Sequence, residues 1–295
     1  GRPQVTSVGG LGGLESSLRL DESLQHFWFP VEFSASLKPD TLIPIELFNV
    51  PWVLFRDKDG RASCVADECA HRACPLSLGK VVDGEVECAY HGWTFDRQGA
   101  CNRMPSTPFC KGVGVRALKC EEVDGFVWVW PGEGEPQVEV PKHMHPPPGY
   151  KIHADLVLEV PVEHGLLVEN MLDMAHTPFT HSPAAKAIPD IVRFKTNGPL
   201  GGNWDPYPID MSFEAPCITL SNIGLAKPGQ VERQPRAGDE CPKHLWQMHV
   251  CLPAKEGHTR LLYRIAFDFT PWLSAIPVIG SLWTQKANQV RSCPG

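Results

Sequence analysis

The sequence has a deficit of positive charge and no apolar run long enough to cross a membrane. It contains 27 Lys and Arg residues against 34 Asp and Glu, a formal net charge of −7. This balance argues against a nucleic-acid-binding protein, whose affinity would come from basic residues on phosphates. A strongly apolar segment, residues 271–283, is interrupted by Pro277 and Gly280 and is shorter than the roughly 20 residues that span a bilayer. We expect at most peripheral membrane contact, or a cover over an apolar ligand.

Glycine and proline are abundant, with 26 and 29 of the 295 residues. This composition excludes a coiled coil or helical repeat and favours a strand-rich, loop-rich enzyme. We expect a mobile leader at residues 1–20, a first domain at 21–148 and a second at 149–295, divided at the Pro146–Pro148 run. Short apolar runs between turn residues predict strands in the first domain: Ile43–Leu47, Trp52–Phe55, Glu85–Cys88, Gly112–Leu118 and Phe126–Trp130, with a hairpin turn at Asp57–Gly60.

The second domain combines one helical segment with alternating strands. An apolar run at Leu156–Val160 precedes Glu163–His176, which is the best helical candidate in the chain. Residues 246–252 and 261–269 each alternate apolar and polar side chains around a turn at Lys255–Gly257, so they predict a β-hairpin. In the second of these strands the odd positions are apolar and the other face carries charge, which predicts that the odd face is buried: Arg260, Arg264 and Asp268 lie on the charged face.

The eleven cysteines include two that are paired with histidines. Cys69 and His71 form a C-x-H pair, and Cys88 and His91 form a C-x2-H pair. Structural zinc sites usually have wider gaps within a ligand pair, whereas this arrangement is typical of a [2Fe–2S] cluster in which two thiolates hold one iron and two imidazoles hold the other. The spacing therefore favours the cluster over zinc.

A second constellation, D-x2-H-x4-H, joins Asp173, His176 and His181. Asp173 and His176 share a helix face, but five further residues rotate His181 about 140° away at 3.6 residues per turn. Pro178 disfavours the helical conformation at the preceding residue, so the helix can stop between the two histidines. Two imidazoles and one carboxylate form the facial site of non-haem Fe(II), which leaves positions open for dioxygen.

These motifs, from Glu68 to Leu76 and from Cys88 to Trp93, resemble those of the Rieske non-haem iron oxygenases. The resemblance implies an α+β chain: an all-β Rieske [2Fe–2S] domain and a helix-grip catalytic domain, an antiparallel sheet with helices. It implies Cys69, His71, Cys88 and His91 as cluster ligands, and a mononuclear Fe(II) on His176 and His181.

The resemblance also implies a role for Asp173, which would pass electrons from the cluster histidine His91 of one subunit to the iron ligand His176 of its neighbour, in a ring such as a trimer. A simpler alternative is that Asp173 only orients His176. Cys74 matches a position where some Rieske proteins have a bridging cysteine, but the second loop offers no partner, so we expect a free thiol. We interpret Cys64, Cys101, Cys110 and Cys120 as small buried hydrophobic residues.

The family takes its third iron ligand from a late helix, and the sequence stops where that helix would begin. We therefore expect a catalytic domain that is incomplete at its C-terminus, as a truncated chain or one that a partner subunit completes. Asp268 is a weak candidate for the missing carboxylate, because it lies on a strand that is predicted to line the core.

Segments around His71, Met104 and Asn170 are similar to the chlorophyllide a oxygenase group of this family. The similarity implies oxidation of a ring methyl of a chlorophyllide-like pigment to a formyl group, with O2 and electrons from reduced ferredoxin, on a chloroplast thylakoid or inner envelope surface. An apolar wall could hold a flat ring: Phe213, Trp246, Met248, Tyr263, Ile265 and Phe267. Two alternatives stay open, namely a Rieske electron-transfer subunit that serves a homologous catalytic chain, and an oxygenase of another tetrapyrrole or a non-pigment aromatic.

Overall fold

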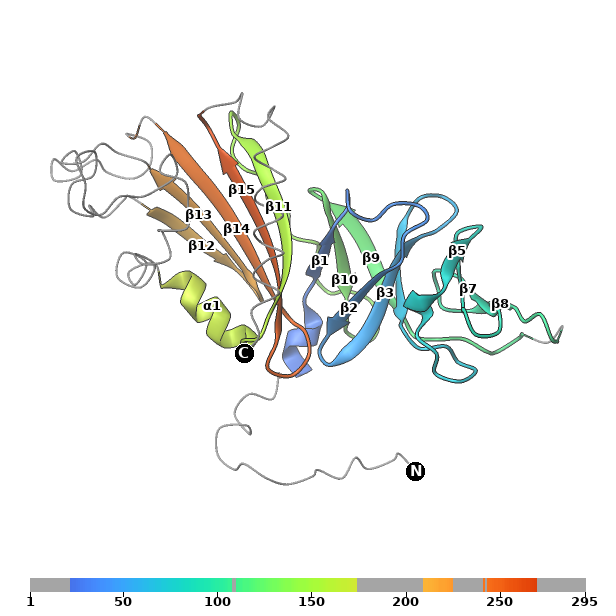
Figure 1. The fold of residues 1–295 in the computed structure, drawn as a ribbon. Helices are drawn as coiled ribbons and strands as arrows, with labels where there is room; N and C mark the ends of the chain where they lie inside the picture. The colour runs from blue at the N-terminus through green and yellow to red at the C-terminus, as the bar shows by residue number, and fades with distance from the viewer. Residues whose placement is uncertain (1–21, 108–109, 174–208, 225–240, 242, 270–295) are drawn as a thin grey trace, which may run out of the picture.

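The computed structural model describes residues 22–107, 110–173, 209–224, 241 and 243–269. The predicted leader, His176, His181 and the apolar segment 271–283 lie outside the described residues. Within them the chain forms three antiparallel sheets and one α-helix (Figure 1). That helix is too short to span a bilayer, and the described part of the chain contains no other candidate span. The predicted strand-rich, helix-poor chain is confirmed for this part.

A six-stranded sheet, in the order β1-β10-β9-β4-β3-β2, forms most of the N-terminal half. The sequence predictions match β2 and β10 at both ends, and Trp52–Phe55 falls inside β3. All five residues of β10 are buried, because both of its faces are covered. The elements of this part are η1 (Glu22–His26), β1 (Phe29–Phe33), β2 (Ile43–Leu47), β3 (Val50–Arg56), β4 (Ala62–Ala66), β9 (Ala117–Val123) and β10 (Phe126–Trp130).

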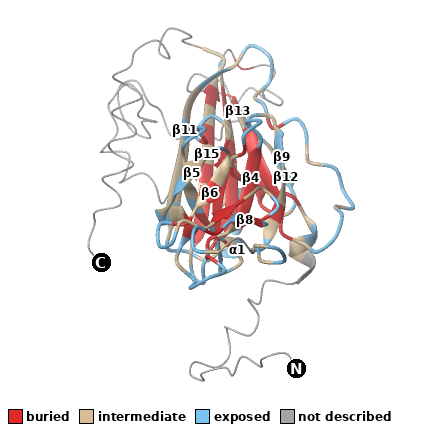
Figure 2. Cartoon of the chain, turned by 90° about the vertical axis from the view of Figure 1, so that its right-hand side faces the viewer, coloured by how far each residue is buried: buried red, intermediate tan, exposed pale blue. Residues whose placement is uncertain are grey.

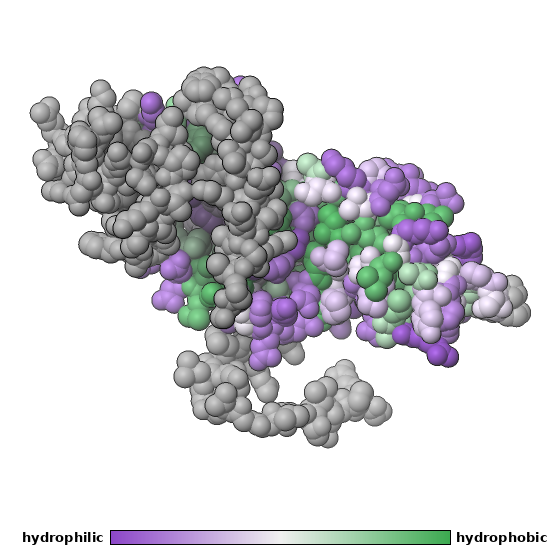
Figure 3. All heavy atoms as spheres, in the orientation of Figure 1, coloured by the Kyte–Doolittle hydropathy of each residue, from purple (hydrophilic) through white to green (hydrophobic). Residues whose placement is uncertain are grey.

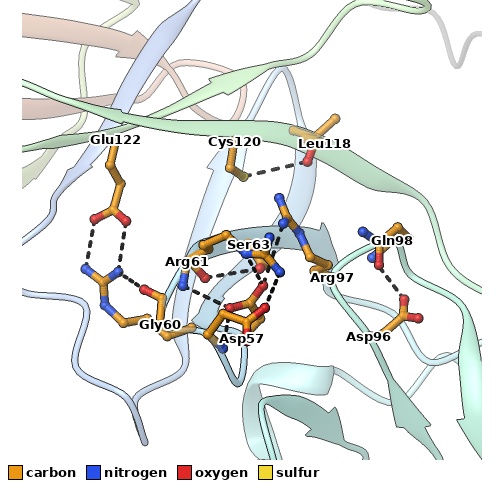
Figure 4. A network of polar contacts seen from close by, with 12 residues as sticks. Asp57, Gly60, Arg61, Ser63, Asp96, Arg97, Gln98, Leu118, Cys120 and Glu122 are labelled. Atoms are coloured by element: carbon orange, nitrogen blue, oxygen red, sulfur yellow. Dashed lines mark hydrogen bonds and ion pairs between the residues drawn. The ribbon is translucent and has the colours of Figure 1, made fainter.

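The predicted hairpin turn between β3 and β4 is confirmed, and Asp57 fixes it (Figure 4). Its carboxylate accepts hydrogen bonds from the backbone N–H groups of Asp59 and Arg61 and pairs with the side chains of Arg61 and Arg97. Burial opposes ionisation of Asp57, but the bonds from Arg61 outweigh it and lower the pKa of this carboxyl. Gly60 has φ +80°, a conformation that suits glycine at the end of the turn.

A small four-stranded sheet, β5-β6-β7-β8, lies at the far end of the six-stranded sheet from the C-terminal half (Figure 1). The predicted strand Gly112–Leu118 is wrong at its start, since β9 begins at Ala117. Residues 112–116 are a loop that runs beside β8, where the N–H of Val115 donates to the carbonyl of Gly99. The elements here are η2 (Leu76–Leu78), β5 (Lys80–Val82), β6 (Glu85–Glu87), β7 (Thr94–Phe95) and β8 (Cys101–Arg103).

The C-terminal half forms a five-stranded sheet in the order β11-β15-β14-β13-β12. The predicted hairpin is β14 and β15, and the predicted helix appears as α1, which packs against β13 and β14 on the side away from the six-stranded sheet (Figure 1). The helix is shorter than the predicted Glu163–His176: it ends at Leu172, and Asp173 is a C-cap with non-helical backbone angles, so the prediction that Asp173 lies on a helix face is wrong. The side chain of Glu163 caps α1 by accepting from the N–H of Gly165 at 2.7 Å. The elements are β11 (Lys151–Val160), α1 (His164–Leu172), β12 (Ile209–Glu214), β13 (Ile218–Gly224), β14 (His244–Pro253) and β15 (Thr259–Phe267).

The prediction of which face of β15 is buried was wrong. The even positions of β15 are buried, among them Leu262 and Ala266, and the odd positions from Leu261 to Phe267 are only half-buried. The even face joins Met248 and Val250 of β14 in one core with the six-stranded sheet, and buried residues concentrate on the strands (Figure 2). We call this side of the five-stranded sheet its inner face, and the side that carries α1 its helix-side face.

Two buried arginines explain the error. The guanidinium of Arg260 contacts the carboxylates of Glu32 at 2.5 Å and Glu159 at 2.8 Å, and thus joins β15 to β1. Arg264 forms two hydrogen bonds to Asp155, and its guanidinium carbon lies 4.6 Å from the ring centroid of Phe126. Paired charges can therefore occupy the inner face. On the face that Figure 3 shows, the described residues of the N-terminal half combine hydrophilic side chains with a hydrophobic area over the six-stranded sheet.

Candidate metal centres

The first ligand loop, residues 69–74, follows β4 and is closed by its own backbone. The N–H of Cys69 donates to the carbonyl of Cys74, and the N–H of Ala73 donates to the carbonyl of Cys69, both at 2.9 Å. Asp67 anchors the loop because its carboxylate accepts from the N–H and the hydroxyl of Ser77 at 2.6 Å. These hydrogen bonds fix the shape of the loop.

The second ligand loop, residues 88–93, repeats this pattern. The N–H of Cys88 donates to the carbonyl of Trp93 at 2.8 Å, and the N–H of Gly92 donates to the carbonyl of Cys88 at 3.0 Å. The fifth residue of each loop has a positive φ, +53° at Ala73 and +69° at Gly92. Two matched loops thus face each other, and each contributes one cysteine and one histidine.

The two histidines meet near the surface. Their Nδ1 atoms lie 3.1 Å apart, and both side chains are exposed. The ring of Trp93 stacks on His71 with centroids 4.6 Å apart, and Tyr90 lies against His91 at 3.9 Å. Desolvation and the neighbouring His91 and Arg72 lower the pKa of His71, which favours the neutral form of the imidazole. The tip of the site therefore offers two converging nitrogen ligands.

The two cysteines lie deeper, below the histidines. Cys69 and Cys88 are 3% and 2% exposed and belong to the apolar core of the four-stranded sheet. Burial and the adjacent Cys88 thiol raise the pKa of Cys69 to about 11. A bound metal cation would keep both neighbouring sulfurs as thiolates, because metal binding displaces their protons.

This arrangement fits a [2Fe–2S] cluster better than a single ion. Two buried sulfurs and two outer nitrogens match one iron held by thiolates and the other by imidazoles. The structure therefore places the four predicted cluster ligands as one pair of imidazoles and one pair of thiols.

The other cysteines in the described part of the chain are free thiols. Cys74 is one of them, as expected, although it lies close enough to Cys88 for the two thiols to interact. Cys64 and Cys101 are buried as expected, whereas Cys110 and Cys120 are only half-buried.

The second constellation is described only at its first residue. Asp173 ends α1, its N–H donates to the carbonyl of Glu169 at 3.0 Å, and its side chain is exposed. The weak candidate Asp268 lies just past β15, where its carboxylate accepts from the N–H of His244 and pairs with the imidazole of that residue. The iron ligands His176 and His181 remain predictions from the sequence.

The predicted apolar wall is wrong as a single surface. Trp246 and Met248 point into the inner face, whereas Tyr263 and Ile265 lie on the helix-side face. The register shows why: Met248 pairs with Arg264, so Tyr263 must point to the opposite side.

A polar row on the helix-side face was not predicted from the sequence. His249 of β14 is directly opposite Thr219 of β13 and Tyr263 of β15. The alternation of Trp246, Met248 and Val250 already placed His249 on the face away from the apolar core, and this signal was available in the sequence.

Family models match two parts of the chain. The model of the Rieske [2Fe-2S] domain matches residues 27–118, and the model of pheophorbide a oxygenase matches residues 213–292. The chain therefore belongs to the Rieske oxygenases. Its fold is that of the solved dicamba monooxygenase, with a TM-score of 0.62 and 20% identity over 86% of this chain and 80% of that one.

Chlorophyllide a oxygenases of chloroplasts are similar over nearly the whole sequence. The Chlamydomonas reinhardtii protein is 59% identical over 94% of this chain and 43% of its own length. The Arabidopsis thaliana protein is 51% identical over 90% of this chain and 50% of its own length. The chain thus spans about half the length of the curated relatives that it matches.

Proposed function

We propose that the protein oxidises the ring methyl of chlorophyllide a to a formyl group in the chloroplast, with O2 and electrons from reduced ferredoxin. The observation that carries the proposal is the pair of matched ligand loops, in a chain that is 59% identical to a chlorophyllide a oxygenase. Residues 21–148 would form the Rieske domain and residues 149–295 a helix-grip catalytic domain. The site of action would be the thylakoid or inner envelope surface.

The chain's own residues would divide the work as follows. Cys69 and Cys88 would hold one iron of the cluster, and His71 and His91 the other. His176 and His181 would hold a mononuclear iron. When bound, the cluster supplies single electrons and the mononuclear iron supplies dioxygen activation. Burial of both thiols excludes water from that side of the cluster, and Trp93 shields His71.

The electron path would cross a subunit interface. Within one chain the ligand loops lie at the end of the molecule away from α1, whose last turn leads to Asp173 (Figure 1). His91 and Asp173 are both exposed. A head-to-tail ring, such as a trimer, would bring His91 of one subunit to Asp173 of the next. A homologous partner chain could complete a mixed ring in the same way.

Replacement of Asp173 by Asn tests this path. We expect both metal centres to remain loaded while the rate of electron transfer from reduced cluster to substrate site falls steeply, because the amide cannot accept hydrogen bonds on both sides as a carboxylate does. Stopped-flow reoxidation of the cluster under O2 with pigment present measures that rate. The control is Glu169→Gln, one turn earlier on α1. Normal reoxidation in Asp173→Asn would show that the bridge is wrong.

Metal content separates the proposal from an electron-transfer subunit. An oxygenase should contain about three irons and two sulfides per chain, whereas a pure electron carrier should contain about two of each. The measurement should be made with and without a candidate partner chain, because a partner could complete the mononuclear site. Two irons in every preparation would favour the carrier.

A second candidate is an oxygenase of a magnesium-free pheophorbide. It is favoured by the match of residues 213–292 to the pheophorbide a oxygenase model. Turnover assays with both pigments, with formyl product measured by absorption and mass, distinguish the two substrates.

A further inference from the structure

The helix-side face of the five-stranded sheet carries a cross-strand row without charge. Phe213, Thr219, His249 and Tyr263 are paired in register on β12, β13, β14 and β15. The adjacent row, Met211, Ser221, Gln247 and Ile265, also contains no charged residue. The arginines of β15 are on the other face, so this surface suits a neutral ligand group.

His249 is held in one orientation within this row. Its Nδ1 lies 3.5 Å from the hydroxyl oxygen of Thr219, and its ring stacks on Tyr263 with centroids 4.8 Å apart. The hydroxyl of Tyr263 in turn donates to Oε1 of Gln247 at 2.9 Å. Nε2 is the ring nitrogen farther from the backbone, and it makes no hydrogen bond to any residue that the structure describes. The imidazole therefore presents this nitrogen off the sheet.

The chemistry of such an imidazole is that of a metal ligand. Burial lowers the pKa of His249 to about 4, so the ring is neutral at physiological pH. Neutral imidazole is the commonest metal ligand of proteins, and the ring nitrogen that does not bind the metal usually bonds to a protein oxygen, as Nδ1 can to Thr219. The magnesium of a chlorophyllide is held by four ring nitrogens and retains an axial position for one further ligand.

We propose that Nε2 of His249 is the axial ligand of the central magnesium of the substrate. This inference rests on the proposed function, because it requires a magnesium tetrapyrrole as substrate. Thr219 and Tyr263 are positioning residues that keep the imidazole upright. A magnesium ligand at this position would select pigments that contain a metal.

The test compares two pigments that differ only in the metal. Chlorophyllide a and pheophorbide a are titrated without O2 into the iron-loaded wild-type protein, His249→Ala and Phe213→Ala. We expect the wild type to bind chlorophyllide a about tenfold tighter or more, which corresponds to about 1.4 kcal/mol. His249→Ala should lose this preference, and added imidazole should restore it for chlorophyllide a alone. Phe213→Ala should keep the preference, since it changes only a contact surface.

Coordination of the magnesium can also be measured by spectroscopy. Resonance Raman marker bands of bound chlorophyllide a should report one axial nitrogen ligand in the wild type, and His249→Gln should lose it. Equal affinity of the wild type for both pigments, or equal losses for both in His249→Ala, would overturn the axial ligand while leaving the substrate class intact. Binding of neither pigment by the loaded wild-type protein would overturn the substrate class itself and the axial ligand with it.

Discussion

The two faces of the five-stranded sheet are built from the same strands but do different work. The inner face buries Met248, Val250 and Leu262 against the six-stranded sheet, and its two arginines are fully paired. The helix-side face carries His249 and Gln247 in uncharged rows, with only a few hydrogen bonds among them. The inner face joins the two halves of the molecule, and the helix-side face carries the polar side chains of the proposed ligand site. Substitutions on the inner face should therefore affect stability, and substitutions on the helix-side face should affect binding.

The largest effect is expected at Arg260. Replacement by Ala leaves the carboxylate of Glu32, which is 3% exposed, without its charge partner in the interface. Removal of one partner of a buried ion pair costs about 3–5 kcal/mol, because the remaining charge is uncompensated. The free energy of unfolding in urea measures this loss.

Arg103→Ala is the matched control, because Arg103 pairs with Glu87 on the surface and its side chain is 55% exposed. We expect that control to lose under about 1 kcal/mol. Equal effects at the two sites would mean that the interface does not depend on Arg260. The double variant Arg260→Met with Glu32→Leu should recover most of the stability, since it removes both charges together.

A second comparison sets Met248 against Phe213. Met248→Ala should cost about 2–5 kcal/mol, because the side chain is 1% exposed and its removal leaves a cavity in the inner face. Phe213 is 46% exposed on the helix-side face, so Phe213→Ala should change stability by only about 0.5 kcal/mol. Thermal or urea unfolding of both variants decides the point, and a large loss at Phe213 would show that the helix-side face also stabilises the fold.

The inner face also shows where sequence reasoning stopped. Alternation in residues 261–269 correctly divided β15 into two faces but could not say which face is buried, and the apolar odd face was the natural choice. The outcome depends on Glu32, which lies 228 positions before Arg260 in the sequence and is brought to it only by the fold. Long-range pairing of charges leaves no local signal in a strand.

The cluster site was predictable for the opposite reason. Cys69 with His71, and Cys88 with His91, are pairs within short loops, so the motif is visible in the local sequence, although the fold is needed to bring the two loops together. The boundaries of β2 and β10 were also local, because turn residues flank both strands. The start of β9 could not be predicted in this way, since the backbone of Val113 and Val115 bonds to Cys101 and Gly99 beside β8 before β9 begins.

The smallest effect at neutral pH is expected at His249. Titration of this residue also distinguishes the two faces. Burial lowers the pKa of this residue from 6.5 to about 4. Below pH 6.5 the unfolded chain binds a proton that the folded protein does not, so this contribution to stability is complete above pH 6.5 and is lost as the pH falls toward 4. Burial also lowers the pKa values of His153 and His164, which add to the same slope.

His249→Gln should therefore reduce the loss of unfolding free energy between pH 6.5 and 4 without abolishing it. Asp57→Asn is the control with a lower pH window: its carboxyl has a lowered pKa, so its contribution is present above pH 3.8 and is lost only below that value. Urea unfolding at pH 7, 5.5 and 4.5 gives the slopes. An unchanged slope in His249→Gln would mean that the imidazole titrates in the folded protein as it does in the unfolded chain, so that burial does not lower its pKa.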